Sequence, residues 1–231
     1  MRKKKLPTNK EELRLLCKAL NLHHLSKIKS FEKKESVDNV DYLFQMLTYE
    51  IEERRKHVID ENKKDSHLPK YNPGRKFNGI NNWNLNSANK LEWFKSGQSL
   101  LIYGKCKIGK TDLACQICET LLEEKIRVYY TKVDALLKAM EKPDLKDNDI
   151  LLRKCDDADV IVLDELFYLP MNNDDITSLY KKLMELLDKE IQFIFISNRR
   201  PQEWKNFIQD KYISETFYDR ITNICRQLAI K

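Results

Sequence analysis

Two of the chain's five glycines flank a short basic segment and have the spacing of a phosphate-binding loop. The segment, Gly104-Lys-Cys-Lys-Ile-Gly109-Lys110-Thr111, matches the pattern G-x-x-x-x-G-K-S/T. Glycine lets the backbone turn so that successive N–H groups point at phosphate oxygens, lysine reaches the β- and γ-phosphates, and the threonine hydroxyl is a ligand for Mg²⁺. The sequence therefore predicts a site for a nucleoside triphosphate together with Mg²⁺. The residues predicted to contact the nucleotide are Gly104, Lys105, Cys106, Lys107, Ile108, Gly109, Lys110, Thr111 and Asp112.

A strongly apolar run farther along the chain, Val160–Leu163, is followed directly by two carboxylates, Asp164 and Glu165. Ligands bind at the carboxyl ends of strands in parallel sheets, and a buried carboxylate is costly without a partner. We therefore predict that Asp164 and Thr111 hold Mg²⁺, and that Glu165 is the general base that orients the water attacking the γ-phosphate. An apolar run that ends in Asp-Glu is common by itself, so this prediction depends on the phosphate loop upstream.

Two later polar residues complete the predicted catalytic set. Asn198 follows an apolar run and is expected beside Asp164, where it would touch the γ-phosphate or the attacking water; an ordinary turn residue is the alternative. Arg220 lies on a predicted helix and is the candidate finger that neutralises charge at the γ-phosphate of a neighbouring subunit; a helix-surface ion pair is the alternative. The catalytic set is Lys110, Glu165, Asn198 and Arg220.

The elements that must position these residues alternate from residue 98 onward, as is typical of parallel strands joined by crossover helices. The predicted strands are 98–103, 126–130, 159–163, 192–196 and 225–230. The predicted helices are 111–124, 132–140, 147–155, 174–189, 201–208 and 213–222. The phosphate loop then joins the first strand to the first helix, whose N-terminus faces the phosphates. The predicted fold class is α/β, a five-stranded parallel sheet flanked by helices.

The first third of the chain has helical periodicity and precedes a linker that contains proline and glycine. Apolar residues recur with helical spacing over 11–25 and 39–60, and residues 50–56 are expected to form a solvated helical face. The predicted domains are a small helical N-terminal domain, 1–68, a linker, 69–80, and an ATPase domain, 81–231. Because the last predicted strand ends one residue before the end of the sequence, no C-terminal lid domain is expected.

The composition favours a globular protein of the cytoplasm, with no membrane partner. The chain has 231 residues, 42% of them hydrophobic and 34% charged, and no apolar segment of membrane-spanning length. Its basic start is not followed by the apolar stretch of a signal peptide. Six cysteines without a disulfide-like framework fit a reducing compartment. Cys115 and Cys118, on the helix after the phosphate loop, are expected to pack in the core rather than bind zinc.

The net charge of +6 lies in the N-terminal third of the chain. Residues 1–75 carry 18 Lys and Arg against 12 Asp and Glu, whereas residues 76–231 carry 24 of each. A basic segment can contact DNA phosphates, but four of the six surplus charges belong to Arg2–Lys5, so a contribution to solubility alone is the alternative.

Taken together, these residues resemble those of the IstB/DnaC group of AAA+ ATPases, which includes helper ATPases of insertion-sequence transposition and loaders of the replicative helicase. The resemblance extends from about Glu11 to Lys231. The most specific stretch is Val162-Leu-Asp-Glu-Leu-Phe-Tyr-Leu-Pro170, similar to the family's Asp-Glu-Leu-Gly-Tyr-Leu-Pro. It is followed by Ser197-Asn198, Glu203-Trp204 and Asp219-Arg220. The resemblance implies a P-loop AAA+ core and ATP-dependent homo-oligomers, often on DNA, with the catalytic and metal-binding residues in the roles given above.

Two positions depart from the family's pattern. The family's phosphate loop is usually Gly-Pro-Pro-Gly-x-Gly-Lys-Thr, whereas Lys105-Cys106-Lys107 fills its interior here. Nucleotide binding is expected to survive, but a Cβ at Lys107 is expected to alter a loop in which glycine takes unusual dihedrals, and the effect on turnover is left open. Phe167 stands where the family has a glycine, which is expected to change packing rather than chemistry.

The leading hypothesis is a DNA-associated ATPase that assembles with ATP bound and delivers a site or a partner to another machine. The resemblance favours a transposition helper that acts with a transposase on duplex DNA in preference to single strands. A loader that acts with the replicative helicase is the alternative. Two other classes stay open: a small-molecule phosphotransferase, which shares the phosphate loop and sheet, and a non-hydrolysing nucleotide-dependent adaptor, suggested by the altered loop interior.

Overall fold

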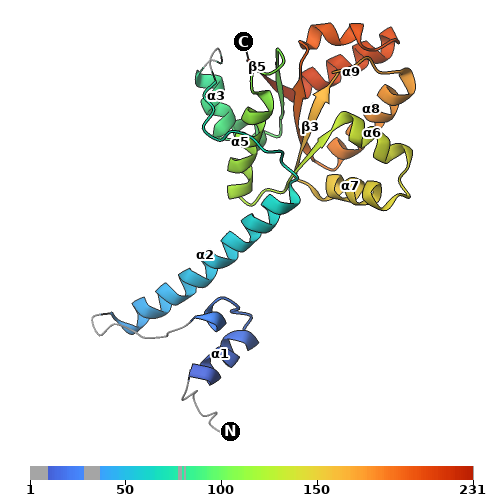
Figure 1. Cartoon of the computed structure of the whole chain (residues 1–231). Helices are drawn as coiled ribbons and strands as arrows, with labels where there is room; N and C mark the ends of the chain where they lie inside the picture. The colour runs from blue at the N-terminus through green and yellow to red at the C-terminus, as the bar shows by residue number, and fades with distance from the viewer. Residues whose placement is uncertain (1–9, 29–36, 78–79, 81, 231) are drawn as a thin grey trace. The chain divides into compact units, whose positions relative to one another are not determined.

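The computed structural model describes residues 10–28, 37–77, 80 and 82–230, which fall within two compact units, residues 1–61 and 62–231 (Figure 1). The division lies within the long helix α2 (Asn39–Asp65), just after Glu61. The functional domain boundaries expected at residues 68 and 80 stay predictions. Among the described residues, no helix is long and apolar enough to cross a membrane.

The N-terminal unit contains helix α1 (Lys10–Ala19), the 3₁₀-helix η1 (Leu25–Lys27) and most of α2. The two predicted helices are confirmed. The first is shorter than the expected range 11–25, and the second continues to Asp65 instead of ending at residue 60.

The expected solvated face over residues 50–56 is wrong at its first position, because Glu50 is only 2% exposed. Its carboxylate accepts a hydrogen bond from the backbone N–H of Leu25 at 2.7 Å and another from Nε of Arg54 at 2.7 Å. A buried carboxylate is tolerated when it is paired and hydrogen-bonded in this way. Glu50 therefore ties η1 to α2 within the N-terminal unit.

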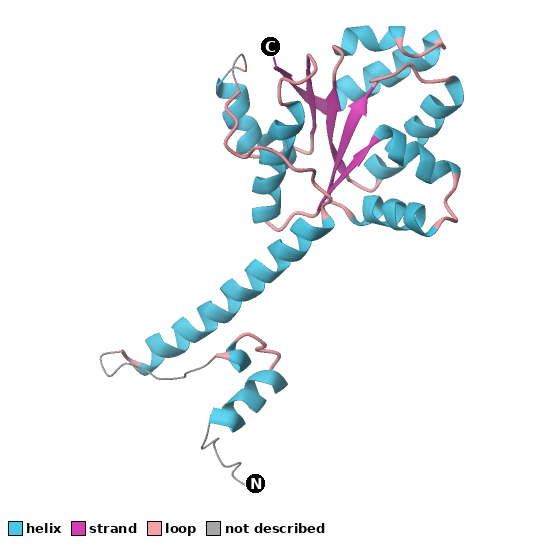
Figure 2. Ribbon diagram, in the orientation of Figure 1, coloured by secondary structure: helices cyan, strands magenta, loops and turns pink. Residues whose placement is uncertain are grey.

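Five parallel strands form one sheet in the second unit, in the order β2-β3-β4-β1-β5 (Figure 2). The strands are β1 (Ser99–Gly104), β2 (Val128–Lys132), β3 (Val160–Leu166), β4 (Gln192–Ser197) and β5 (Cys225–Ile230). Every predicted strand is confirmed, with its ends within about three residues of the expected ones. Because β4 lies between β3 and β1, the acidic pair near the end of β3, Asn198 after β4 and the phosphate loop after β1 lie at the carboxyl ends of three adjacent strands.

Helices cover both faces of the sheet. They are α3 (Asn82–Asn89), α4 (Glu92–Lys95), α5 (Lys110–Glu123), α6 (Val133–Glu141), α7 (Lys146–Asp157), α8 (Asn173–Asp188), α9 (Lys211–Ile224) and the 3₁₀-helix η2 (Pro201–Asn206). The predicted helices are confirmed except over 201–208, where the segment is a 3₁₀-helix that ends at Asn206. Ile208 instead forms an isolated bridge with Met171, which ends the helical segment early.

Alternate strand residues pack into two hydrophobic cores on opposite faces of the sheet. Leu101 of β1 and Phe195 of β4 face a core completed by α6, α7, α8 and α9. Their neighbours Leu100 and Ile194 face a core completed by α3, α4 and α5. Figure 1 shows α3 and α5 on one side of the sheet and α6 to α9 on the other. Burial on both faces explains why the strands are nearly continuous apolar runs.

The two cysteines of α5 are part of this packing. Cys115 and Cys118 are both fully buried, and burial raises the pKa of Cys115 to about 12. Within the described ranges, no group of three or more His, Cys, Asp and Glu side chains could hold a metal ion. The prediction that these cysteines pack in the core is confirmed.

Residues 66–77, here called the strap, pack along α5 and overlap the predicted linker. The side-chain amide of Gln116 on α5 donates hydrogen bonds to three strap carbonyl oxygens at 3.1–3.3 Å, including those of Asn72 and Arg75. At the start of the strap, the carbonyl oxygen of Ser66 accepts a hydrogen bond from the backbone N–H of Tyr130 at 2.8 Å. The strap therefore connects the edge strand β2 to the helix that follows the phosphate loop.

Candidate nucleotide-binding site

The phosphate loop connects β1 to α5 as predicted, and its backbone requires both glycines. Gly104 has φ 154°, and a Cβ there would collide with the carbonyl oxygen of Ile230 in β5. Gly109 has φ 97° at the N-terminus of α5, and a Cβ there would collide with the side chain of Arg75. Of the four residues between the two glycines, 105–107 are exposed, so the loop is accessible to a ligand.

Lys107 also takes a backbone conformation that favours glycine, with φ 63°. The left-handed region costs a residue with a Cβ about 1–2 kcal/mol. The interior of the loop therefore keeps the dihedral that a glycine would supply, although the sequence has a lysine there. The expectation that a Cβ at position 107 alters the loop is therefore not borne out at the φ of this residue.

Lys110 begins α5 and is 6% exposed. Its Nζ donates hydrogen bonds to the carbonyl oxygens of Gly104 at 3.0 Å and Lys105 at 2.7 Å. Burial lowers the pKa of Lys110, an effect that the negative charge of Asp164 partly opposes. The ammonium group is thus held inside the loop by carbonyl oxygens that are weaker acceptors than phosphate oxygens.

Thr111 and Asp164 meet and join the two predicted halves of the site. Oγ1 of Thr111 donates a hydrogen bond to Oδ2 of Asp164 at 2.9 Å, and the hydroxyl of Tyr130 donates to the same oxygen at 2.8 Å. Oδ1 of Asp164 accepts from the backbone N–H of Glu165 at 2.6 Å. All three donors are neutral, so these bonds orient the carboxylate without cancelling its charge.

The oxygen atoms of this pair fit Mg²⁺. The ion prefers hard oxygen ligands, and it usually takes one or two from the protein and the rest from phosphates and water. Asp164 supplies a buried carboxylate, 7% exposed, and Thr111 supplies a hydroxyl within hydrogen-bonding distance of it. That Thr111 and Asp164 hold Mg²⁺ stays a prediction.

Glu165 lies on a β-bulge near the end of β3. The pairing of β3 with β4 shifts between Leu163 and Leu166, and Glu165 has φ 64°. Because a bulge re-aims a side chain, Glu165 is 37% exposed whereas the adjacent Asp164 is buried. Oε1 of Glu165 accepts a hydrogen bond from Nζ of Lys132 at 2.8 Å, and this bond raises the pKa of Lys132.

The other two predicted catalytic residues lie in different surroundings. Asn198 is half-buried directly after β4, at the same sheet edge as Asp164, as the sequence predicts. Arg220 is exposed on α9, while Phe217 and Ile221 of that helix face the core. Within the described part of the chain, no hydrogen bond or ion pair joins Arg220 to the phosphate loop. The expected role in a neighbouring subunit's site stays a prediction.

Tyr130 and Lys132 are site residues that the sequence analysis missed. The predicted strand ended at Tyr130 and the next helix began at Lys132, whereas β2 continues through Lys132. Residues two apart on a strand share a face, and the register shift in β3 turns Glu165 so that Tyr130 reaches Asp164 while Lys132 reaches Glu165. A strand extended by two residues would have placed both side chains beside β3, but the bulge that brings Glu165 to Lys132 has no signal in the sequence.

Arg75 is a third missed residue, and its partner is one that the sequence did single out. Asp112, predicted to contact the nucleotide, forms an ion pair with Arg75 at 2.9 Å and accepts a hydrogen bond from the N–H of Asn72 at 3.2 Å. Nη2 of Arg75 also donates to the carbonyl oxygen of Lys107 at 3.2 Å. Arg75 lies in a segment without periodicity, so no sequence signal connects it to the loop.

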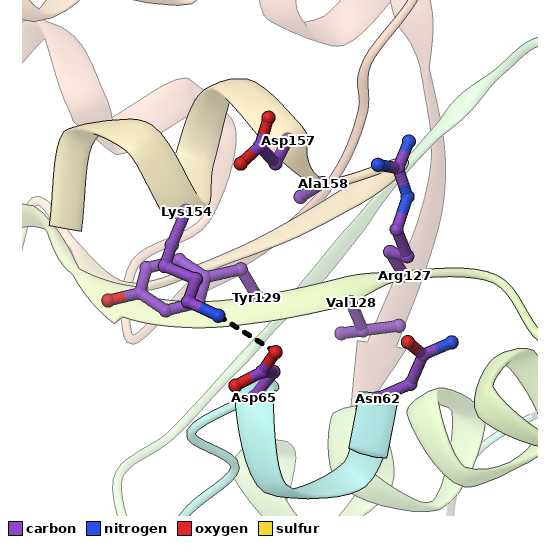
Figure 3. Close-up of a pocket in the computed structure, with 8 residues that line it drawn as sticks. All are labelled: Asn62, Asp65, Arg127, Val128, Tyr129, Lys154, Asp157 and Ala158. Atoms are coloured by element: carbon purple, nitrogen blue, oxygen red, sulfur yellow. Dashed lines mark ion pairs between the residues drawn. The ribbon is translucent and has the colours of Figure 1, made fainter. Parts of the chain in front are cut away.

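A cavity of about 330 Å³ lies at the amino end of β2, away from the carboxyl ends of the strands that hold this site, and is not part of it (Figure 3). It is lined by Val128 and Tyr129 near the start of β2 and by the end of α7. Figure 3 shows Lys154 reaching toward Asp65, with which it forms an ion pair at 2.8 Å. Because Lys132 ends the strand that Val128 begins, the length of β2 separates this cavity from the acidic pair.

Comparisons of the sequence identify a family of ATP-binding proteins. The model of the family described as IstB-like ATP binding protein matches residues 9–231. The chain is 22% identical over 231 residues to a Bacillus thuringiensis subsp. berliner protein named as an ATP-binding protein of insertion sequence IS232, covering 97% of this chain and 91% of the relative. It is 24% identical over 230 residues to a Pseudomonas aeruginosa protein named as an ATP-binding protein of insertion sequence IS21, covering 95% and 86%.

Comparisons of the structure agree on the fold. AMPPCP-bound DnaA from Aquifex aeolicus is similar with a TM-score of 0.54 at 21% identity, over 71% of this chain and 51% of DnaA. The DnaC helicase loader is similar with a TM-score of 0.53 at 17% identity, over 72% of this chain and 97% of the loader chain. This chain thus spans about half the length of DnaA and nearly all of the loader structure. The five-stranded core is a P-loop AAA+ fold, as predicted.

Proposed function

The chain belongs to the family of IstB-like ATP-binding proteins, and we propose that it hydrolyses ATP where the phosphate loop meets Asp164 and Glu165. The observation that carries this proposal is the 2.9 Å hydrogen bond between Thr111 and Asp164. It brings a hydroxyl and a carboxylate together beside the buried Lys110, with a half-exposed carboxylate as the next residue in the chain. Metal ligands, a phosphate-binding cation and a base are the parts that phosphoryl transfer to water requires.

In the proposed reaction, Lys110 leaves the carbonyl oxygens of Gly104 and Lys105 and binds β- and γ-phosphate oxygens. Glu165 accepts a proton from water as the water oxygen attacks the γ-phosphorus, and the bond between that phosphorus and the bridging oxygen breaks to release ADP. Asn198 orients the attacking water. Thr111 and Asp164 would hold Mg²⁺, which when bound offsets the charge of the phosphates.

We further propose that the protein assembles on DNA with ATP bound and acts as a transposition helper with a transposase. Two relatives over nearly the whole chain are named as ATP-binding proteins of insertion sequences, which supports this assignment. The basic excess within residues 1–75 supports contact with DNA phosphates. A loader of the replicative helicase is the second candidate, because the match to the DnaC helicase loader covers 97% of that chain.

The test is steady-state ATP hydrolysis without DNA, with duplex DNA and with single-stranded DNA, with the Glu165→Gln variant as the blank. Stimulation by duplex DNA supports the transposition helper, and stimulation by single strands supports the loader. Turnover that is unchanged in Glu165→Gln contradicts the proposed hydrolysis and indicates an adaptor that only binds nucleotide. Transfer of the γ-phosphate to a nucleoside or nucleotide instead of water would identify a phosphotransferase.

A further inference from the structure

We propose that Arg75 is a positioning residue of the nucleotide site, which holds the phosphate loop in its binding conformation by fixing the left-handed backbone at Lys107. A glycine at position 107 would take this conformation without a Cβ penalty and would need no such contact. With a lysine there, Arg75 supplies the contact that holds the backbone. The inference rests on the proposed nucleotide site and adds a residue from outside the loop to it.

The guanidinium group of Arg75 bridges the middle of the loop and the first turn of α5. Nη2 donates to the carbonyl oxygen of Lys107 at 3.2 Å, and Nη1 pairs with Oδ2 of Asp112 at 2.9 Å. The group also lies against the α-carbon of Gly109, where a Cβ would collide with it. Glycine at this position therefore does more than permit a turn: it leaves space for Arg75.

The bond to the carbonyl oxygen of Lys107 fixes the peptide that follows a strained residue. Lys107 has φ 63°, which a side chain with a Cβ disfavours. In a trans peptide the C=O and the next N–H point in opposite directions. By holding the carbonyl oxygen toward itself, Arg75 directs the N–H of Ile108 in the opposite direction, away from the guanidinium group. Inward N–H groups are what a phosphate loop uses to bind phosphate.

Arg75 can do this because its own position is fixed. Its carbonyl oxygen accepts a hydrogen bond from Gln116 at 3.3 Å, and the N–H of Asn72 donates to Asp112 at 3.2 Å. The pair of Arg75 with Asp112 is partly buried, at 38% and 20% exposure of the two side chains. A charge-assisted bond in such a setting is stronger than a bond between neutral groups.

The test is calorimetric titration with ATP and Mg²⁺ in the Glu165→Gln background, so that ATP is not consumed. We expect Arg75→Ala to weaken ATP binding by about tenfold to a hundredfold. Adding Lys107→Gly to Arg75→Ala should restore about tenfold, because glycine takes the left-handed conformation without the Cβ penalty. Adding Lys107→Ala, which removes the same charge but keeps the Cβ, should restore nothing. Lys76→Ala, at an exposed lysine of the strap, is the matched control and should bind like its parent.

Equal recovery by Lys107→Gly and Lys107→Ala would overturn the inference, because it would show that charge and not backbone strain is involved. If Arg75→Ala does not fold, Arg75→Met keeps an unbranched side chain but has no donor for the carbonyl oxygen, and rescue by Lys107→Gly is tested in that variant. Unchanged affinity in Arg75→Ala would overturn this inference alone. Failure of the Glu165→Gln parent to bind ATP at all would overturn the proposed function as well.

Discussion

Lys132 and Glu165 form an ion pair in which Nζ lies 2.8 Å from Oε1. The two side chains are 51% and 37% exposed, so the pair is largely in water and is expected to stabilise the fold by only about 0.2–1 kcal/mol. It nevertheless holds the proposed base toward β2 and occupies one of its two oxygens. The strand that orients Asp164 through Tyr130 thus also restrains the carboxylate next to it.

Replacing Lys132 with methionine should raise ATP turnover without DNA by up to about fivefold, because a pair of this strength restrains the base by no more than about 1 kcal/mol. Phosphate release at saturating ATP measures the effect. Lys138→Met, at an exposed lysine of α6, is the matched control. A fall in turnover in Lys132→Met would show that the lysine assists the reaction instead of restraining the base.

Tyr130→Phe should raise the Mg²⁺ concentration needed for hydrolysis by about tenfold or more, because partners that orient a metal-binding carboxylate typically have effects of this size. Mn²⁺ binding to the ATP complex, followed by electron paramagnetic resonance, should weaken in parallel. Tyr129→Phe removes a hydroxyl from the same strand on the side of the cavity in Figure 3 and should leave the Mg²⁺ dependence unchanged. Identical Mg²⁺ curves for the two variants would contradict the role of Tyr130.

At Phe167, substitution by glycine should destabilise the fold less than substitution by alanine, which is the reverse of the usual order. Phe167 is 1% exposed, its ring centroid lies 5.1 Å from that of Trp204 and 5.3 Å from that of Phe217, and its φ is 55°. Phe167→Ala should cost about 3–5 kcal/mol of unfolding free energy through lost packing. Phe167→Gly should cost about 1 kcal/mol less, because glycine accepts positive φ.

Urea unfolding of both variants measures this difference. Phe193 of β4 is the control position, since it is equally buried but lies in an extended strand, where alanine should be more stable than glycine. If alanine is the better substitute at both positions, strain at Phe167 is not important for stability.

Lys110 should make ATP binding depend on pH in the alkaline range. Burial lowers its pKa, so in the free protein it loses its proton below the ordinary lysine value of about 10.4. Phosphate oxygens favour the charged form, so ATP binding should take up protons as the pH approaches this range and should weaken as it rises further. Without nucleotide, the free energy of unfolding should change with pH in the opposite direction and increase as the pH rises above the lowered pKa of Lys110. Above that pKa the side chain is neutral, so the cost of burying its charge disappears.

Calorimetric titrations in pairs of buffers with different ionisation enthalpies measure this proton uptake. We expect uptake at about pH 9.5 that exceeds the uptake at about pH 8. The same uptake at both values would mean that Lys110 keeps its charge throughout.

Arg220→Ala should bind ATP normally and hydrolyse it about a hundredfold or more slowly, if the exposed arginine acts on a neighbouring subunit's γ-phosphate. Lys110→Ala subunits cannot use their own site but still carry Arg220. Mixing the two variants should therefore restore part of the activity. A mixture as inactive as its components would contradict action between subunits.

The sheet could be predicted because its strands are buried on both faces and are continuous apolar runs between polar segments. The phosphate loop and the acidic pair were predictable for a related reason, since each directly follows such a run. Tyr130 and Lys132 were missed because the end of β2 was placed two residues early. Arg75 could not be predicted, because its contacts to the loop are made 32 and 37 positions away in a segment without periodicity.

The position of β1 in the sheet determines when the nucleotide site can form during folding. β1 pairs only with β4 and β5 among the described strands, and Gly104 lies against the carbonyl oxygen of Ile230. During synthesis on a ribosome, the phosphate loop is therefore made well before β4, the first strand that can pair with β1. At typical rates of synthesis the two are separated by a delay on the order of 5–20 s. We expect the nascent chain to gain its affinity for ATP in a single late step, so that nucleotide can stabilise the finished fold but cannot guide its early assembly.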